Sequence, residues 1–180
     1  MSHPLPPLPR PQYAVIGIGC SSEVPAQIAD DLQEIGIPAG AIGYEYRPLS
    51  EAAFLAGIGE SGLVAFGTSG LFGRIGIDVA TRRVVQIPRV DSTTCSHVNK
   101  DLSTFHRCIA AMIARFPFYE EDEEEIFQVV ADELHELIAA LDDTAFADDG
   151  FWETLCDDMA IGDYPSKFLR GHAAYHRVQP

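Results

Sequence analysis

Residues 67–88 read GTSGLFGRIGIDVATRRVVQIP, and this stretch decides the fold. Glycine recurs at every third position, at 67, 70, 73 and 76. Residues 74–78 alternate between polar and apolar side chains, residues 80–81 supply a turn, and residues 83–87 form a second run that ends at a proline. Two short runs of this kind predict an antiparallel hairpin, with the glycines at its turns and bulges.

A phosphate-binding loop is the other interpretation of a glycine-rich segment. Residues 57–62, GIGESG, match the G-x-G-x-x-G pattern of dinucleotide-binding proteins. That pattern binds pyrophosphate only where it follows a strand and opens a helix, because the amides at the helix start face the phosphate. Here the next residues, LVAFG, are typical of a strand. The pattern therefore predicts no nucleotide site.

The chain before the hairpin begins with five prolines in residues 1–12, which predict a flexible arm. Apolar residues at helical spacing predict a helix over 24–35, capped by Ser22 and stopped by Gly36. Residues 42–46 are expected to form a strand that ends at Pro48. A short helix over 50–55 and a strand over 63–66 follow in this interpretation.

After the hairpin, an extended piece over 94–98 precedes a helix that opens at Asp101 or Ser103. In that helix Cys108 falls on the apolar stripe and His106 is expected to face solvent. An amphipathic helix is predicted over 123–141 and a shorter one after Gly150. This order predicts an α+β fold, with an antiparallel or mixed sheet flanked by helices. We expect one domain over 13–163 and a C-terminal tail over 164–180.

The charge of the 180-residue chain is strongly uneven. The formal net charge is −15, and residues 120–163 hold 17 of the 27 acidic residues and no lysine or arginine. Such acidity disfavours direct binding to nucleic acid or to an anionic membrane, and it favours association with a basic partner. A solvated helix face without a partner explains the same charges equally well. No apolar run reaches the roughly 18 residues of a membrane span.

Cysteine and histidine supply the remaining candidates for chemistry. The four cysteines form no CxxC pair, which predicts reduced thiols in a cytoplasmic protein. Cys95 and His97, and then His106 and Cys108, form two spaced pairs. Residues two apart on a helix point about 200° away from each other, so the second pair cannot share an ion and no metal is expected. A hydrolase that uses Cys20 or Ser69 stays open as an alternative and needs a nearby histidine.

At family level, the middle of the chain resembles the SUKH superfamily of Smi/Knr-like proteins. The run from Gly67 to Pro88, followed by HVNKDLSTFHRCIAAM, carries the resemblance, and FWETLCDDMAIG resembles the Phe-Trp helix of SUKH-4 immunity proteins. The chain departs from the family pattern at His97, at Lys100, and at Arg82, which stands where a hairpin glycine is usual. The signature positions that match include the following residues: Gly70, Asp78, Val85, Asn99, Phe105 and Trp152.

The resemblance implies a non-catalytic cytoplasmic protein that neutralises a cognate polymorphic toxin, often a nuclease or a deaminase acting on nucleic acid. It implies no cofactor. We expect the partner to be basic, and the candidate contacts are the following acidic residues: Glu121, Asp122, Glu124, Glu125 and Asp132. A regulatory protein-interaction module on the same fold is the alternative. No motif indicates the oligomeric state.

Overall fold

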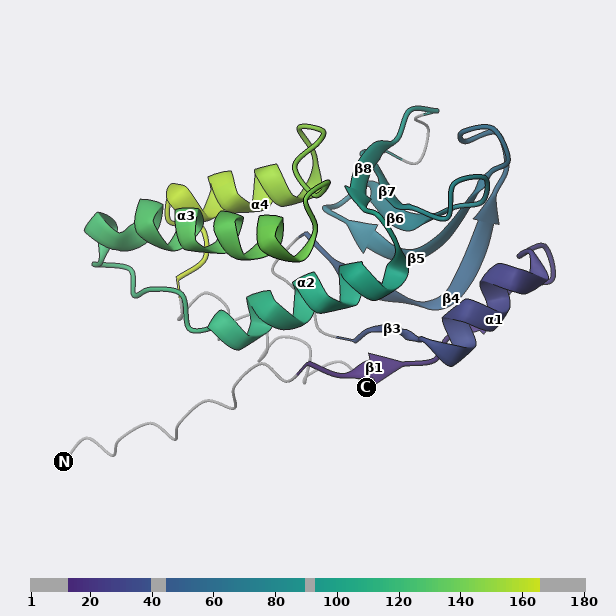
Figure 1. The fold of residues 1–180 in the computed structure, drawn as a ribbon, viewed down its shortest axis with the longest axis horizontal. Coiled ribbons are helices and arrows are strands. Elements are labelled where there is room, and N and C mark those ends of the chain that lie inside the picture. The colour runs from purple at the N-terminus through teal and green to yellow at the C-terminus, as the bar shows by residue number, and fades with distance from the viewer. Residues whose placement is uncertain (1–12, 40–44, 90–92, 166–180) are drawn as a thin grey trace.

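The computed structural model describes residues 13–39, 45–89 and 93–165, and it has the expected α+β architecture (Figure 1). The strands are β1 Val15–Ile16, β2 Gly19–Cys20, β3 Ile37–Pro38, β4 Arg47–Leu55, β5 Leu63–Ser69, β6 Gly73–Asp78, β7 Val84–Ile87 and β8 Ser96–Asn99. The helices are α1 Ala26–Glu34, α2 Leu102–Arg115, α3 Glu124–Leu141 and α4 Phe151–Ala160. The expected arm over 1–12 and the residues beyond 165 lie outside the described ranges.

The main sheet of the described residues is mixed, with strand order β2-β4-β5-β6-β7-β8. The β2–β4 pair is parallel and the other pairs are antiparallel. A separate two-stranded piece joins β1 and β3. The predicted hairpin is confirmed as β6 and β7, which pair from Arg74↔Ile87 to Ile77↔Val84.

The turn of this hairpin is closed by Asp78, whose Oδ1 accepts hydrogen bonds from the backbone N–H and the hydroxyl of Thr81 at 2.7 and 2.8 Å. Arg82 adopts φ +64°, the left-handed conformation for which the family's usual glycine is suited. The guanidinium of Arg82 forms an ion pair with Asp31 of α1. The arginine therefore keeps the turn geometry and joins the hairpin to the first helix.

The glycines of the opening stretch have different functions. Gly70 has φ +56° and open space around it, so it serves the turn between β5 and β6. Gly67 lies where the β5–β6 register shifts, which agrees with the predicted bulge. A Cβ on Gly76 would lie 2.4 Å from the carbonyl oxygen of Val64, so this glycine permits close contact between two strands.

The prediction for the segment before β5 was wrong. β4 runs through Pro48 and occupies residues 47–55, where a short helix was expected, and residues 42–44 of the expected strand lie outside the described ranges. Among the described residues β2 pairs with β4 only at Glu51 and Ala52, so no strand described on that side of Pro48 requires the donor that proline lacks. The β4–β5 register also shifts between Pro48 and Ala53.

The helix starts were predicted with mixed success. α2 begins as expected, because Oδ1 of Asp101 accepts from the backbone N–H of Thr104 at 2.7 Å. The predicted Ser22 cap is wrong, since the capping position of α1 is Pro25 and no side chain caps the helix. α3 begins one residue later than predicted, and α4 follows Gly150 as predicted.

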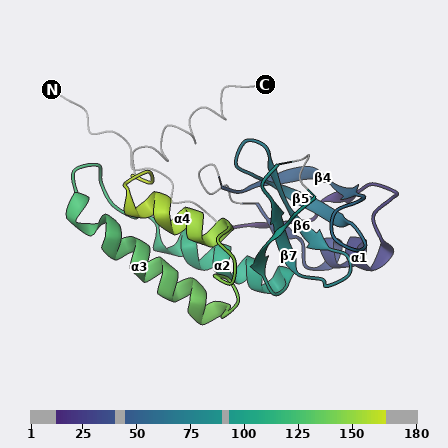
Figure 2. The ribbon, with the colours of Figure 1, turned by 90° about the horizontal axis from the view of Figure 1, so that it is seen from above.

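The main core lies where α1 and α2 pack on one face of the sheet, and α3 and α4 extend it beyond the sheet (Figures 1 and 2). Phe105 of α2 is at its centre and makes edge-on contacts with Tyr46, Phe66 and Phe151 at centroid distances of 5.3–6.1 Å. A smaller cluster contains Ile58, Leu63, Val85 and Ile87. Residues 57–62, the GIGESG loop, lead directly into β5, so a strand follows them as expected.

Candidate interaction surface

The acidic residues predicted as contacts all lie on the surface, and four of them cluster at the start of α3. Glu121 and Asp122 lie in the preceding turn, and Glu124 and Glu125 form the first turn of the helix. Carboxylates at this position also stabilise the helix itself, because its N-terminus carries partial positive charge. The cluster therefore has a local structural role as well as its effect on the surface potential.

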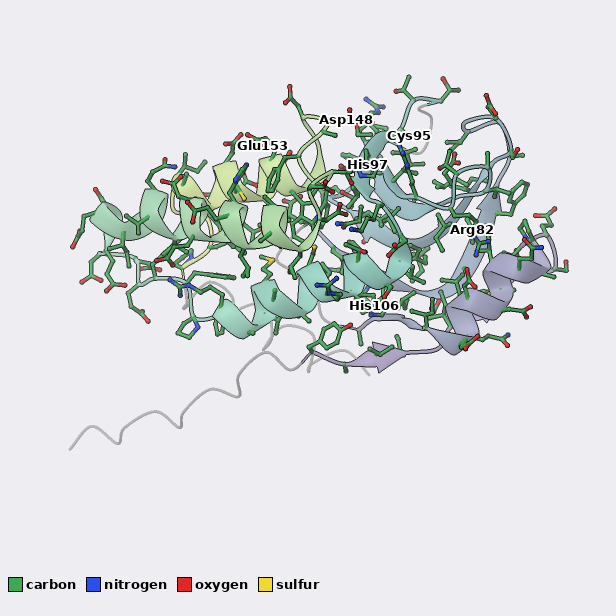
Figure 3. All side chains as sticks on the ribbon, in the orientation of Figure 1. Arg82, Cys95, His97, His106, Asp148 and Glu153 are labelled. Carbon is green, nitrogen blue, oxygen red and sulfur yellow. The ribbon has the colours of Figure 1, made fainter. Side chains whose placement is uncertain are left out.

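Asp132 belongs to a different part of this surface. It lies two turns further along α3, where its Oδ1 accepts a 2.8 Å hydrogen bond from Gln128. Burial, followed by the charges of Glu153, Asp157 and Asp132, raises the pKa of Cys156 in α4 to about 12. Asp132 therefore acts on the same thiol as two carboxylates of α4, one of which, Glu153, is labelled in Figure 3, and it is separated along α3 from the Glu121–Glu125 cluster.

One carboxylate of α3 is already paired. Nε and Nη2 of Arg115, at the end of α2, both donate to Oε2 of Glu133, at 3.2 and 2.8 Å. Exposed pairs of this kind contribute about 0–1 kcal/mol to stability. The pair removes Glu133 from the set of carboxylates with no basic partner.

A buried polar network, which the sequence did not indicate, holds the acidic helices against the sheet. Asn99 at the end of β8 donates from Nδ2 to Oδ2 of Asp142, the residue after α3, at 2.8 Å. The Oδ1 of Asn99 accepts from Nε1 of Trp152 in α4 at 3.1 Å. All three side chains are at most 1% exposed. The signature positions Asn99 and Trp152 therefore have a direct physical link, which Asp142 completes.

Asp142 is well supplied with donors. Its Oδ2 also accepts from the backbone N–H of Lys100 at 3.0 Å, and its Oδ1 accepts from the backbone and the hydroxyl of Thr144. Burial alone would raise the pKa of Asp142, but hydrogen bonds from Asn99, Thr144 and Lys100 outweigh burial and lower that pKa. The residue is therefore a buried carboxylate at neutral pH.

His97 joins β8 to the loop between α3 and α4 (Figure 3). Its Nε2 lies 2.7 Å from the hydroxyl of Thr144, and its backbone N–H donates to Oδ2 of Asp148 at 2.7 Å. Burial lowers the pKa of His97 and so favours the neutral ring. Cys95 lies just before β8 and is exposed as a residue, but its thiol is partly shielded from water. This shielding, followed by the charge of Asp78, raises the pKa of the thiol, which therefore stays protonated.

The prediction that His106 faces solvent was wrong. Its ring is 7% exposed, with Nδ1 in contact with the hydroxyl of Tyr13 and Nε2 2.9 Å from the carbonyl oxygen of Gly36. Burial lowers its pKa. These partners lie far away in the sequence, so helical periodicity could not reveal them. Cys108 is buried in the core, as predicted.

The candidate nucleophiles have no histidine partner among the described hydrogen bonds. Ser69 is buried and its hydroxyl accepts from Gln86 at 2.6 Å. Burial, followed by the charge of Glu51, raises the pKa of Cys20, which disfavours the reactive thiolate. Within the described ranges no three histidine, cysteine or acidic side chains are placed to hold a metal ion.

The described helices include none with the length and apolar character that crossing a bilayer requires. No curated protein and no solved structure matches the chain. The family model described as SUKH-4 immunity protein matches residues 23–158, a span that runs from α1 to α4 and contains the hairpin, Asn99 and Trp152. With most of its length matched, the chain belongs to the SUKH-4 immunity protein family.

Proposed function

We propose that this chain binds a cognate polymorphic toxin in the cytoplasm and neutralises it by covering its functional surface, without catalysis. The family match over residues 23–158 is the observation that carries this proposal. The acidic surface of α3 and α4 favours a nuclease or a nucleic-acid-modifying deaminase as the toxin, because enzymes that act on nucleic acid present basic clefts.

In this proposal the carboxylates of α3 guide the encounter with the toxin. A surface of one charge sign raises association rates by 10-fold to 1,000-fold, and it contributes less to the lifetime of the complex. The candidate contacts are Glu121, Asp122, Glu124, Glu125 and Asp132, all of which are exposed. Neutralising them is expected to slow association and to weaken its dependence on salt.

The test measures inhibition of the toxin domain encoded by the adjacent gene. The purified chain is expected to form a stable complex with this domain and to abolish its activity. Replacing all five candidate carboxylates by their amides is expected to lower the association rate constant at least 10-fold at low ionic strength. A wild-type chain that neither binds nor inhibits the toxin domain would overturn the proposed function.

The chain offers a matched control for net charge. Five exposed acids on the other part of the molecule can be replaced in the same way, giving an equal change in charge: Glu23→Gln, Asp30→Asn, Glu34→Gln, Glu51→Gln and Glu60→Gln. This control is expected to associate nearly as fast as the wild-type chain. Equal slowing in both variants would mean that total charge, and not the α3 surface, directs the encounter.

A further inference from the structure

The turn between β5 and β6 exposes two large apolar side chains next to each other. Ser69 and Gly73 are the last paired residues of the two strands, and Gly70, Leu71 and Phe72 form the turn. The side chain of Leu71 is 80% exposed and that of Phe72 is 68% exposed. We call this pair the Leu71–Phe72 tip.

Folding does not account for the apolar character of the tip. Gly70, with φ +56°, supplies the reversal of the chain, and neither Leu71 nor Phe72 belongs to a core cluster. Polar residues would serve an exposed turn of this kind without placing apolar surface in water. Contiguous apolar surface exposed to water marks binding sites, whereas single scattered apolar side chains are common on any protein surface.

The strands beneath the tip are closely packed. The hydroxyl of Ser69 accepts a 2.6 Å hydrogen bond from Gln86 of β7. A Cβ on Gly73 would lie 2.6 and 2.7 Å from the carbonyl oxygens of Ser69 and Ile87, so the three strands approach closely there. A turn on such a base loses little conformational freedom on binding, which favours affinity.

The charges near the tip differ from those of the acidic helices. From Leu63 to Ile77 the sequence contains one charged residue, Arg74, whose Nη1 donates to the carbonyl oxygen of Gly73. Arg47 and Arg74 both pair with Thr68 in the strand register, so the two arginines are on the same face of the sheet as Thr68, next to the turn. Apolar and aromatic side chains next to arginine are the composition of an interface centre, which is depleted in carboxylates and lysine.

We propose that the Leu71–Phe72 tip is the apolar anchor for the cognate toxin. It inserts into an apolar pocket of the toxin whose rim carries carbonyl or carboxylate oxygens for Arg74. This inference rests on the proposed function and assigns the main binding energy to a surface other than α3. The tip sets the lifetime of the complex, and the carboxylates of α3 set the rate of encounter.

The experiment compares a double variant, which carries both Leu71→Ser and Phe72→Ser, with the control Ile161→Ser. Ile161 follows α4 and is 71% exposed. The probe is an inactivated toxin domain encoded by the adjacent gene, immobilised for kinetic measurement. The double variant is expected to bind about 100-fold more weakly, mainly through faster dissociation. The control is expected to bind within threefold of the wild-type chain. Both variants should unfold at the wild-type urea concentration, because the replaced side chains are exposed.

The outcomes separate this inference from the proposed function. Toxin binding by the wild-type chain with less than threefold loss in the double variant would overturn the anchor and leave the proposed function in place. Equal loss in the Ile161→Ser control would also overturn it. Failure of the wild-type chain to bind the toxin domain would overturn both. Tip-dependent binding to phosphatidylglycerol vesicles, with unchanged toxin affinity, would assign the tip to a membrane and refute the inference.

Discussion

Removing the Asn99 side chain is expected to destabilise the fold by about 3–4 kcal/mol. The variant Asn99→Ala loses the hydrogen bond to the Asp142 carboxylate, and bonds to charged groups contribute about 1.5–3 kcal/mol. It also leaves the indole N–H of Trp152 without its acceptor in the core, which costs about 1–3 kcal/mol. Asp142 keeps its donors on Lys100 and Thr144, so the carboxylate stays hydrogen-bonded and the sum stays below the upper limits.

Urea unfolding measures this change directly. For slopes of about 1–3 kcal/mol per molar urea, a loss of about 3–4 kcal/mol moves the midpoint by about 1–4 M. Trp152 is the only tryptophan and is fully buried, so its fluorescence reports the transition in Asn99→Ala and in the wild-type chain. A decrease in unfolding free energy below about 1 kcal/mol would refute the conclusion that this network links the sheet to the acidic helices.

A double-mutant cycle isolates the bond between Asn99 and Trp152. The variant Trp152→Phe removes the indole N–H, and unfolding of all four proteins is then followed by circular dichroism. The coupling free energy is expected to be about 0.5–1.5 kcal/mol. A coupling within about 0.3 kcal/mol of zero would contradict a hydrogen bond that matters for stability.

The variant Asn99→Asp tests the same site by charge. Two carboxylates would then share a buried site at neutral pH, and one of the pair would take up a proton as the pH falls. Its stability deficit relative to the wild-type chain is therefore expected to shrink between pH 7.5 and pH 5. A deficit that does not change with pH would mean that Asp142 is not the partner of residue 99.

Three further predictions follow from single positions. Burial and then the neighbouring Asp158 raise the pKa of Glu45 from 4.5 to about 7, so the folded protein holds this proton more tightly than the unfolded chain and loses stability as the pH rises through that range. After allowance for solvent screening, Glu45→Gln should remove about 1–2 kcal/mol of this loss, measured by urea titrations at pH 5 and pH 8. An unchanged dependence of stability on pH in the variant would contradict the pairing of Glu45 with Asp158. Arg82→Val should lower the unfolding free energy by about 1–2 kcal/mol, because a β-branched residue is strained at φ +64°. Arg82→Gly should stay within about 0.5 kcal/mol of the wild-type chain in thermal melts. Equal losses of stability in the two variants would refute the role of backbone strain. Gly76→Ala should lower the unfolding free energy by about 3 kcal/mol, since its methyl group meets the Val64 carbonyl at 2.4 Å, and wild-type stability would show that the strands can separate without cost.

The hairpin and the helices could be predicted because their signals are local. The alternation over β6 and β7, the Asp101 cap and the apolar stripe of α3 each lie within one element. β4 was missed because a proline such as Pro48 usually ends a strand. Among the described residues β2 pairs only further along β4, and this makes the proline acceptable in the strand. That information belongs to the strand order and not to the segment.

The candidate site was predictable in one respect only. The exposure of the α3 carboxylates follows from the helical pattern, but the grouping of Asp132 with α4 depends on how two helices pack. The hydrogen bonds of Asn99 to Asp142 and Trp152 span 43 and 53 residues, beyond the reach of any local pattern. Leu71 and Phe72 resemble ordinary strand residues in the sequence, and their exposure depends on where the turn falls.

The carboxylates that hold the α3–α4 loop to β8 also determine which molecules can associate with the sheet. An edge strand with open amides is a template on which another chain can add a strand. At β8, the backbone N–H of His97 donates to Asp148 and that of Lys100 donates to Asp142, so these donors are not available to an incoming strand. The opposite edge, β2, is two residues long. These features disfavour the addition of another strand at either edge of the described sheet, and they favour contacts with a partner through side chains.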